Sequence, residues 1–272
     1  MSEAGSVLRV DRSPPGSVVR VTLARPAVRN AFNAELIAAL HEAFEALAGE
    51  PAESLRAVVL AGEGSVFCAG ADIEWQRAAL RLSAEENRAD AARLHDMLAT
   101  IDACPAPVIA RVHGAALGGG IALCAVSDIV IATTDARFGF TETKLGILPA
   151  VISPFVVPKI GETHARALFP SGERFGAERA RRIGLVHEVV ADEEALDARV
   201  DATLGELLSA GPTAARAAKR IVRELRGRSA GEQRALVTEV AAAQRVSPEG
   251  QEGLTAFLDK RSPSWRGDPR IE

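Results

Sequence analysis

The sequence predicts an α/β fold that is followed by a helical C-terminal region. Short apolar segments suited to buried strands alternate with amphipathic segments suited to helices through most of the chain. From about Asp192 onward the pattern is almost purely helical. We therefore expect an α/β core over residues 1–200 and a helical region over residues 201–272.

The first predicted elements are two strands with a helix between them. VVRVTL (18–23) alternates and is rich in β-branched residues, which indicates a strand. Asn33 can cap a helix that runs to about Ala48 and carries its apolar side chains on one face. LRAVVLAG (55–62) is a nearly continuous apolar run, which is typical of a strand buried on both faces.

The alternation continues with a long helix and two further strands. Residues 83–103 are predicted to be helical, because Ser83 followed by Glu86 forms a capping-box pattern at their start. PAPVIARV (105–112) and DIVIAT (128–133) are predicted to be buried strands, with a short helix between them.

Composition and charge narrow the class of protein. Of the 272 residues, 47% are hydrophobic and 25% are charged, as in an ordinary globular domain. The net charge of −4 favours neither nucleic acid nor an acidic membrane as a partner, and no apolar run approaches the ~20 residues that span a bilayer. The three cysteines stand in apolar settings and the sequence shows no export signal, so we expect a cytoplasmic protein. We expect no metal, because no Cys/His spacing resembles a zinc site.

Three consecutive glycines lie in the apolar stretch HGAALGGGIALCAVSD (113–128). Glycine inside a helix costs about 1 kcal/mol relative to alanine, so Gly118, Gly119 and Gly120 need a physical reason. At a helix start, glycines let a negatively charged oxygen approach the free backbone N–H groups. Close helix–strand packing is the simpler alternative.

A second loop of small residues and one acidic residue favour the first explanation, that the glycines let a negatively charged oxygen approach free backbone N–H groups. FCAGAD (67–72) also follows a buried strand, so two loops can direct two N–H groups at one point, as in an oxyanion hole for a carbonyl that becomes an enolate. Glu142 lies in the loop ARFGFTETKLGILPA (136–150). If it is partly buried, its raised pKa suits proton transfer; a solvated or salt-bridged acid is the alternative.

These segments together resemble the enoyl-CoA hydratase/isomerase family, or crotonase superfamily. LARPAVRNAFN, FCAGADI, GAALGGG and FGFTETKLGILP follow the order of the family's motifs, and ERARRIGLVHEVV (178–190) and EGLTAFLDKR (252–261) resemble its later landmarks. The resemblance implies a crotonase-like spiral of ββα turns that forms two nearly perpendicular sheets. It also implies a C-terminal helical region that assembles homotrimers, often paired into homohexamers.

The resemblance also implies roles for individual residues. The main-chain N–H groups of Ala71 and Gly119 would hold the thioester oxygen of an acyl-CoA, and Glu142 would move the proton. The coenzyme A would be part of the substrate, so no separate cofactor is expected. Residues expected to line the coenzyme A channel are Val28, Arg29, Ala69, Asp72 and Ile73, and those expected near its phosphate end are Phe257 and Lys260, although Phe257 equally suits a structural role.

One position departs from the family pattern. Family hydratases use a second glutamate just after the glycine run, where this chain has Ala122. Glu142 alone could then add water, or shift a double bond as an isomerase, or the site could be degenerate. FGFTETKLGILPAVISPFVVPKIG resembles bacterial hydratases of 3-methylglutaconyl-CoA in leucine breakdown, which favours the hydratase. Candidate partners for such a substrate's carboxylate are Arg77, Arg81 and Lys144.

A different class of function remains possible at this stage. AAKRIVRELRGR (217–228) is a basic helical stretch that could bind RNA or an acidic protein on the same scaffold. A solvated helix face is favoured over this reading, because the net charge is negative and no aromatic side chains lie between the basic ones for base stacking. We therefore expect an acyl-CoA thioester as the partner, and neither nucleic acid nor a membrane.

Overall fold

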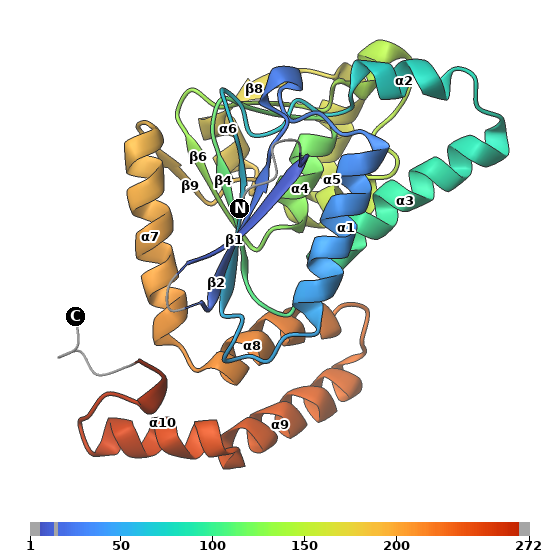
Figure 1. Cartoon of the computed structure of the whole chain (residues 1–272). Coiled ribbons are helices and arrows are strands. Elements are labelled where there is room, and N and C mark those ends of the chain that lie inside the picture. Colours follow the sequence, from blue (N-terminus) through green and yellow to red (C-terminus); the bar gives the residue numbers. More distant parts are fainter. Residues whose placement is uncertain (1–5, 14–15, 267–272) are drawn as a thin grey trace.

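A six-stranded sheet forms the centre of the molecule. Figure 1 shows the computed structural model, which describes residues 6–13 and 16–266. The strand order is β1-β2-β3-β4-β6-β9. β1 pairs antiparallel with β2, and the remaining neighbours pair in parallel. The strands are β1 (Leu8–Ser13), β2 (Val18–Leu23), β3 (Ala57–Gly62), β4 (Val108–Val112), β6 (Ile129–Thr133) and β9 (Glu188–Val190).

Helices cover both faces of this sheet (Figure 1). The buried apolar side chains form two clusters, a larger one and a smaller one. Val58 and Leu60 of β3 belong to the larger cluster, together with the helices on one face of the sheet. Val59 belongs to the smaller cluster, together with α7 on the other face. This two-sided burial confirms the expectation drawn from the continuous apolar run. The helices of the larger cluster are α1 (Ala34–Ala48), α3 (Ala84–Asp102), α4 (Gly119–Val126), α5 (Ser153–Ser171) and α6 (Ala177–Arg182), and α7 spans Glu193–Ser209.

A second, three-stranded sheet adjoins the first. Its order is β5-β7-β8, with β5 (Ala115–Leu117), β7 (Arg137–Gly139) and β8 (Arg174–Gly176). Two isolated bridges extend its pairing, one between Cys68 and Ala116 and one between Phe32 and Ala71. The segment 67–72 therefore lies between the loop at Phe32 and the strand that leads into the glycine run.

The C-terminal helices stand apart from the sheet. These are α8 (Pro212–Glu224), α9 (Ala230–Val246) and α10 (Pro248–Leu258), and they lie at the opposite end of the molecule from α2 (Ile73–Ala79) in Figure 1. The expected boundary at residue 200 falls inside α7, which packs on the sheet. α8 follows α7 and is attached to the core through Arg216 and Lys219, whereas α9 and α10 pack on α8 and on each other.

Most of the expected helices and strands are present, but several of them begin or end at other residues than expected. Asn33 accepts a hydrogen bond from the N–H of Leu36 and caps α1, and Ser83 forms the expected capping box with Glu86 at the start of α3. The expected strands 55–62 and 105–112 begin later, at Ala57 and Val108. These local signals were sufficient because each cap or apolar run is contained within one segment.

Candidate active site

A cavity of about 290 Å³ opens between α2, α3 and the segment that follows β7. It brings together residues from five separate parts of the chain, among them all three residues expected to carry the chemistry. The lining residues are Phe32, Ala71, Trp75, Gln76, Ala79, Asn87, Asp90, Ala91, Leu94, Gly119, Glu142 and the run from Ile147 to Ile152.

Main-chain hydrogen bonds hold the two small-residue loops side by side. The N–H of Cys68 donates to the carbonyl of Ala115 at 3.0 Å, and the N–H of Leu117 donates back to Cys68 at 3.0 Å. Among the hydrogen bonds of the residues that the structure describes, neither the N–H of Ala71 nor that of Gly119 is a donor. Two main-chain donors are therefore available at the cavity wall, and one of them is the first N–H of helix α4.

The three glycines have three different neighbours. A Cβ atom on Gly118 would lie 3.2 Å from Oε1 of Glu142, and one on Gly119 would lie 2.5 Å from Cε2 of Phe32. A Cβ on Gly120 would lie 2.5 Å from the carbonyl oxygen of Cys68. Close packing therefore requires glycine at positions 119 and 120, and the positive φ of 49° at Gly118 favours glycine there. The close-packing alternative thus accounts for the run, and the approach of a substrate oxygen stays a prediction.

Glu142 lies in a short 3₁₀ helix, η2 (Thr141–Leu145). Its carboxylate is packed against the backbone of Gly118. Its Oε2 atom is buried and has no hydrogen-bond partner among the described residues. Burial raises the pKa of the Glu142 carboxyl above its ordinary value of 4.5, and its own backbone N–H offsets only part of that effect. A carboxyl in this state suits proton transfer near neutral pH.

Ala122 is completely buried in α4 and belongs to the apolar core. It has no group that can hold water or carry a proton. The other carboxylate at the cavity belongs to Asp90 on α3, which is paired with Arg93 at 2.8 Å. Asn87 and Leu94 project from the same helix face. Sequence analysis did not identify this wall, although the positions 87, 90, 91 and 94 follow helical spacing.

The cations expected to bind a substrate carboxylate are not among the cavity-lining residues. Arg77 is exposed and pairs with Glu74 at 2.6 Å. Arg81 is also exposed, and the side chain of Lys144 packs on Gly172. None of these three candidates contributes to the wall of this cavity, and a carboxylate-binding role for them stays a prediction.

The residues expected along the coenzyme A channel surround the loops beside the cavity. The N–H of Ala69 donates to the carbonyl of Arg29 at 3.0 Å, and Arg29 adopts a left-handed conformation next to the exposed Val28. Ile73 is also exposed. Their roles in binding stay predictions.

Asp72 is occupied by structural contacts. It caps α2 and accepts a hydrogen bond from Arg25 at 2.9 Å. Burial raises the pKa of Asp72, but hydrogen bonds from the N–H of Glu74 and from Arg25 outweigh that effect and lower the pKa overall. Its side chain thus organises the loop and has little capacity left for a ligand.

The last two expected binding residues are far from the cavity in this chain. Phe257 belongs to α10 and Lys260 follows it, at the end of the molecule opposite to α2 (Figure 1). Both side chains are exposed. One chain therefore does not bring them to the site.

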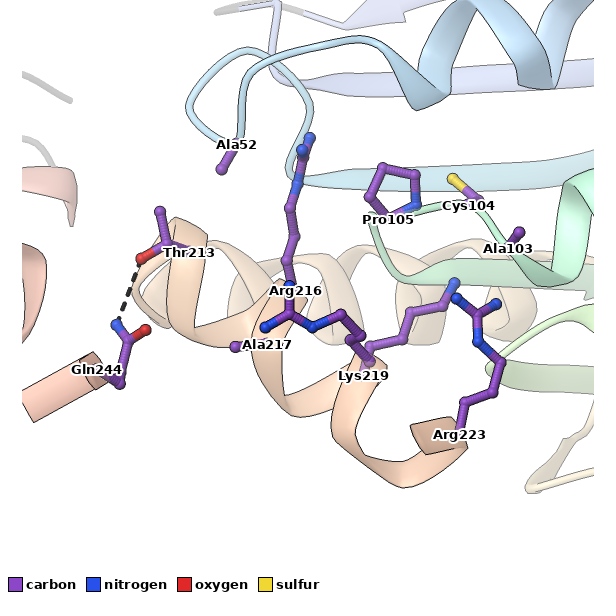
Figure 2. A pocket seen from close by; sticks show the side chains of 11 residues that line it. Ala52, Ala103, Cys104, Pro105, Thr213, Arg216, Ala217, Lys219, Arg223 and Gln244 are labelled. Atoms are coloured by element: carbon purple, nitrogen blue, oxygen red, sulfur yellow. Dashed lines mark hydrogen bonds between the residues drawn. The ribbon is translucent and has the colours of Figure 1, made fainter. Parts of the chain in front are cut away.

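A second pocket lies against the basic helix α8 (Figure 2). Arg216 donates to the main-chain carbonyls of Glu50, Pro51 and Leu55. Lys219 pairs with Asp128 at 2.6 Å, and Arg223 donates to the carbonyl of Asp102. These cations attach α8 to the core. This use of their charges argues against the RNA-binding alternative.

Comparison with known proteins identifies the family. The enoyl-CoA hydratase/isomerase family model matches residues 14–268, and the chain belongs to this family. It is 36% identical to a crotonyl-CoA hydratase of Syntrophomonas wolfei, over 89% of this chain and 91% of that protein. It is 34% identical to a 2,3-dehydroadipyl-CoA hydratase of Escherichia coli, over 92% of this chain and 95% of that protein.

Solved structures agree on the fold. Pseudomonas aeruginosa AtuE superposes with a TM-score of 0.91 at 38% identity, covering 96% of this chain and 99% of that one. The expected crotonase fold is confirmed. Across residues 6–13 and 16–266, no helix has both the length and the apolar character needed to cross a bilayer.

Proposed function

We propose that the chain is an enoyl-CoA hydratase that adds water across the α,β double bond of an acyl-CoA thioester. One observation supports this most strongly: Ala71 and Gly119, whose main-chain N–H groups donate no hydrogen bond within the described residues, line one cavity together with Glu142, whose buried Oε2 atom has no partner there. This combination matches a reaction in which an oxyanion forms while a proton is moved.

In the proposed reaction the thioester oxygen accepts hydrogen bonds from Ala71 and Gly119. Glu142 takes a proton from water, and the water oxygen forms a bond to the β-carbon. The double-bond electrons move toward the carbonyl and give an enolate. Glu142 then returns the proton to the α-carbon, which yields the 3-hydroxyacyl-CoA. Because Ala122 replaces the second carboxylate, one residue performs both transfers.

We further propose that the acyl group is uncharged. The cavity wall includes Asp90 and no lysine or arginine among the described residues. A carboxylated acyl chain would lose hydration beside a like charge without gaining a partner. The absence of a cation from this wall, over the part of the chain that the structure describes, argues against 3-methylglutaconyl-CoA as the substrate. The similar hydratases do not decide the point, because one is named for an uncharged acyl group and another for a carboxylated one.

Isomerisation of a 3-enoyl-CoA is the second candidate, because it needs one base and no water. The observation that favours it is the apolar residue at Ala122.

Steady-state assays separate these possibilities. The wild type is tested with crotonyl-CoA, 3-methylglutaconyl-CoA and 3-hexenoyl-CoA, together with Glu142→Gln. We expect crotonyl-CoA hydration, and a loss of kcat of roughly 100- to 10,000-fold in the variant. Glu162→Gln is the matched control, since Glu162 is exposed on α5. Unchanged hydration in Glu142→Gln would contradict the mechanism, and turnover of 3-hexenoyl-CoA alone would identify an isomerase.

A further inference from the structure

Helix α4 connects the cavity to the interior of the protein. Its first N–H, at Gly119, lies at the cavity, and every residue from Gly120 to Val126 is buried. The helix has eight residues, which corresponds to a length of about 12 Å. A charge at its carbonyl end is therefore close enough to affect the N–H end.

Side chains satisfy the carbonyls at the C-terminal end of α4. The hydroxyl of Ser127 donates to the carbonyl of Leu123 at 2.7 Å. The ammonium group of Lys159, on α5, donates to the carbonyl of Cys124 at 3.2 Å and to the carbonyl of Ser127. A partly buried cation thus lies where the helix dipole is negative.

We propose that Lys159 is a positioning residue for the reaction: by binding the carbonyl end of α4, it fixes the helix and increases the positive potential at the Gly119 N–H. This inference rests on the proposed role of Gly119 in the oxyanion hole. Lys159 touches no substrate, so its effect is transmitted through the helix.

Several charged groups surround Lys159. Asp128 follows α4, Asp102 ends α3, Lys219 comes from α8 and His187 precedes β9. Asp128 is already paired with Lys219 at 2.6 Å, so the hydrogen bonds of Lys159 go to main-chain carbonyls.

These surroundings make the charge of Lys159 sensitive to alkaline pH. Burial lowers the pKa of Lys159 below its ordinary value, and the neighbouring Cys124 and the carboxylates of Asp128 and Asp102 oppose that effect. As pH rises, Lys159 therefore loses its proton earlier than an exposed lysine does. Burial also lowers the pKa of His187 below its ordinary value.

Three variants test the proposal on crotonyl-CoA hydration. Lys159→Met should lower kcat about tenfold, equivalent to about 1.4 kcal/mol, with little change in KM. Lys159→Arg should keep most of kcat. We expect kcat of the wild type to decline at alkaline pH, and Lys159→Arg should abolish this decline because arginine stays charged. Lys219→Met is the matched control: it removes a similar cation that contacts Asp128 and Ala106 but no α4 carbonyl.

A spectrum provides a readout that needs no turnover. A conjugated dienoyl-CoA should show a red-shifted absorbance when the hole polarises its carbonyl. The shift should shrink in Lys159→Met and persist in Lys159→Arg and Lys219→Met. If Lys159→Met does not fold, Lys159→Arg and the wild-type pH profile still decide the question.

Failure of the positioning role of Lys159 can be distinguished from failure of the proposed function. Equal kcat in wild type and Lys159→Met, or equal losses in Lys159→Met and Lys219→Met, would overturn the positioning role and leave the proposed function intact. An alkaline decline that persists in Lys159→Arg would do the same. No red shift in the wild type would overturn the oxyanion hole, and the positioning role with it.

Discussion

At the scale of single residues, Gly119 is constrained by the ring of Phe32. Alanine at this position would place a methyl group 2.5 Å from that ring. We expect Gly119→Ala to displace the ring toward the cavity, to lower stability by about 1–3 kcal/mol and to lower kcat/KM more than tenfold. Urea unfolding and steady-state kinetics measure both effects.

Two further variants make this prediction specific. Gly205 lies inside α7 and a Cβ there would meet nothing within 4 Å, so Gly205→Ala should raise stability by about 0.5–1 kcal/mol without affecting turnover. Adding Phe32→Leu to Gly119→Ala should restore part of the lost stability. Equal stability of Gly119→Ala and wild type would contradict the steric argument.

Glu142 makes opposite contributions to activity and stability. Because burial raises the pKa of its carboxyl, the folded chain holds this proton more tightly than the unfolded chain does. Stability contributed by the protonated form is therefore present below the ordinary pKa of 4.5 and is lost as pH rises through the raised folded pKa. Glu142→Gln should raise the urea midpoint at pH 7 and leave it nearly unchanged at pH 4. A variant less stable than wild type at pH 7 would contradict this.

At the scale of elements, the connection between α2 and α3 determines one wall of the cavity. The amide of Asn87 donates to the carbonyls of Leu82 and Ser83, both at 3.1 Å. We expect Asn87→Ala to raise KM several-fold, while unfolding stability falls by about 1 kcal/mol. Ser83→Ala is the comparison, because it removes only the cap of α3, at a similar cost in stability. Equal KM values in the two variants would show that the Asn87 amide does not shape the wall.

The elements found from sequence alone are those with local signals. The capping box at Ser83 and the apolar run of β3 each lie within one segment, so pattern and propensity identified them. The strands of the second sheet are only three residues long and are defined by pairing partners far away in sequence. Helix α5 contains Pro158, Pro170 and a non-helical Gly161, each of which normally ends a helix pattern.

In the site, too, features within one segment can be predicted from sequence, whereas contacts between distant segments cannot. Glu142 is a candidate from sequence because it stands in a distinctive loop, and the family resemblance adds Ala71 and Gly119 from two further loops. The contact of Phe32 with Gly119, the Asp90 wall and the position of Lys159 under α4 depend on how distant segments pack, which one sequence does not specify.

At the scale of the whole molecule, α10 carries several large apolar side chains that are exposed in the single chain. Leu254, Phe257 and Leu258 are 49%, 80% and 76% exposed, and surfaces of this kind usually mark an interface. We propose a homotrimer or homohexamer. Light scattering should give three or six times the chain mass of 28.6 kDa. Phe257→Glu combined with Leu258→Glu should give the single-chain mass. A wild type that is monomeric would contradict the proposal.

Assembly also bears on the binding role expected of Lys260. In one chain this residue follows α10, which lies at the end of the molecule opposite to α2 (Figure 1), so we expect it to meet the phosphates of a bound coenzyme A only at the site of a neighbouring copy. Lys260→Glu should therefore raise KM several-fold in the assembled protein, because a phosphate contact becomes a repulsion. The same change should leave KM unaltered in the monomeric Phe257→Glu, Leu258→Glu background if that variant retains turnover. Unaltered KM in both backgrounds would remove Lys260 from the binding site and leave α10 with assembly as its proposed task.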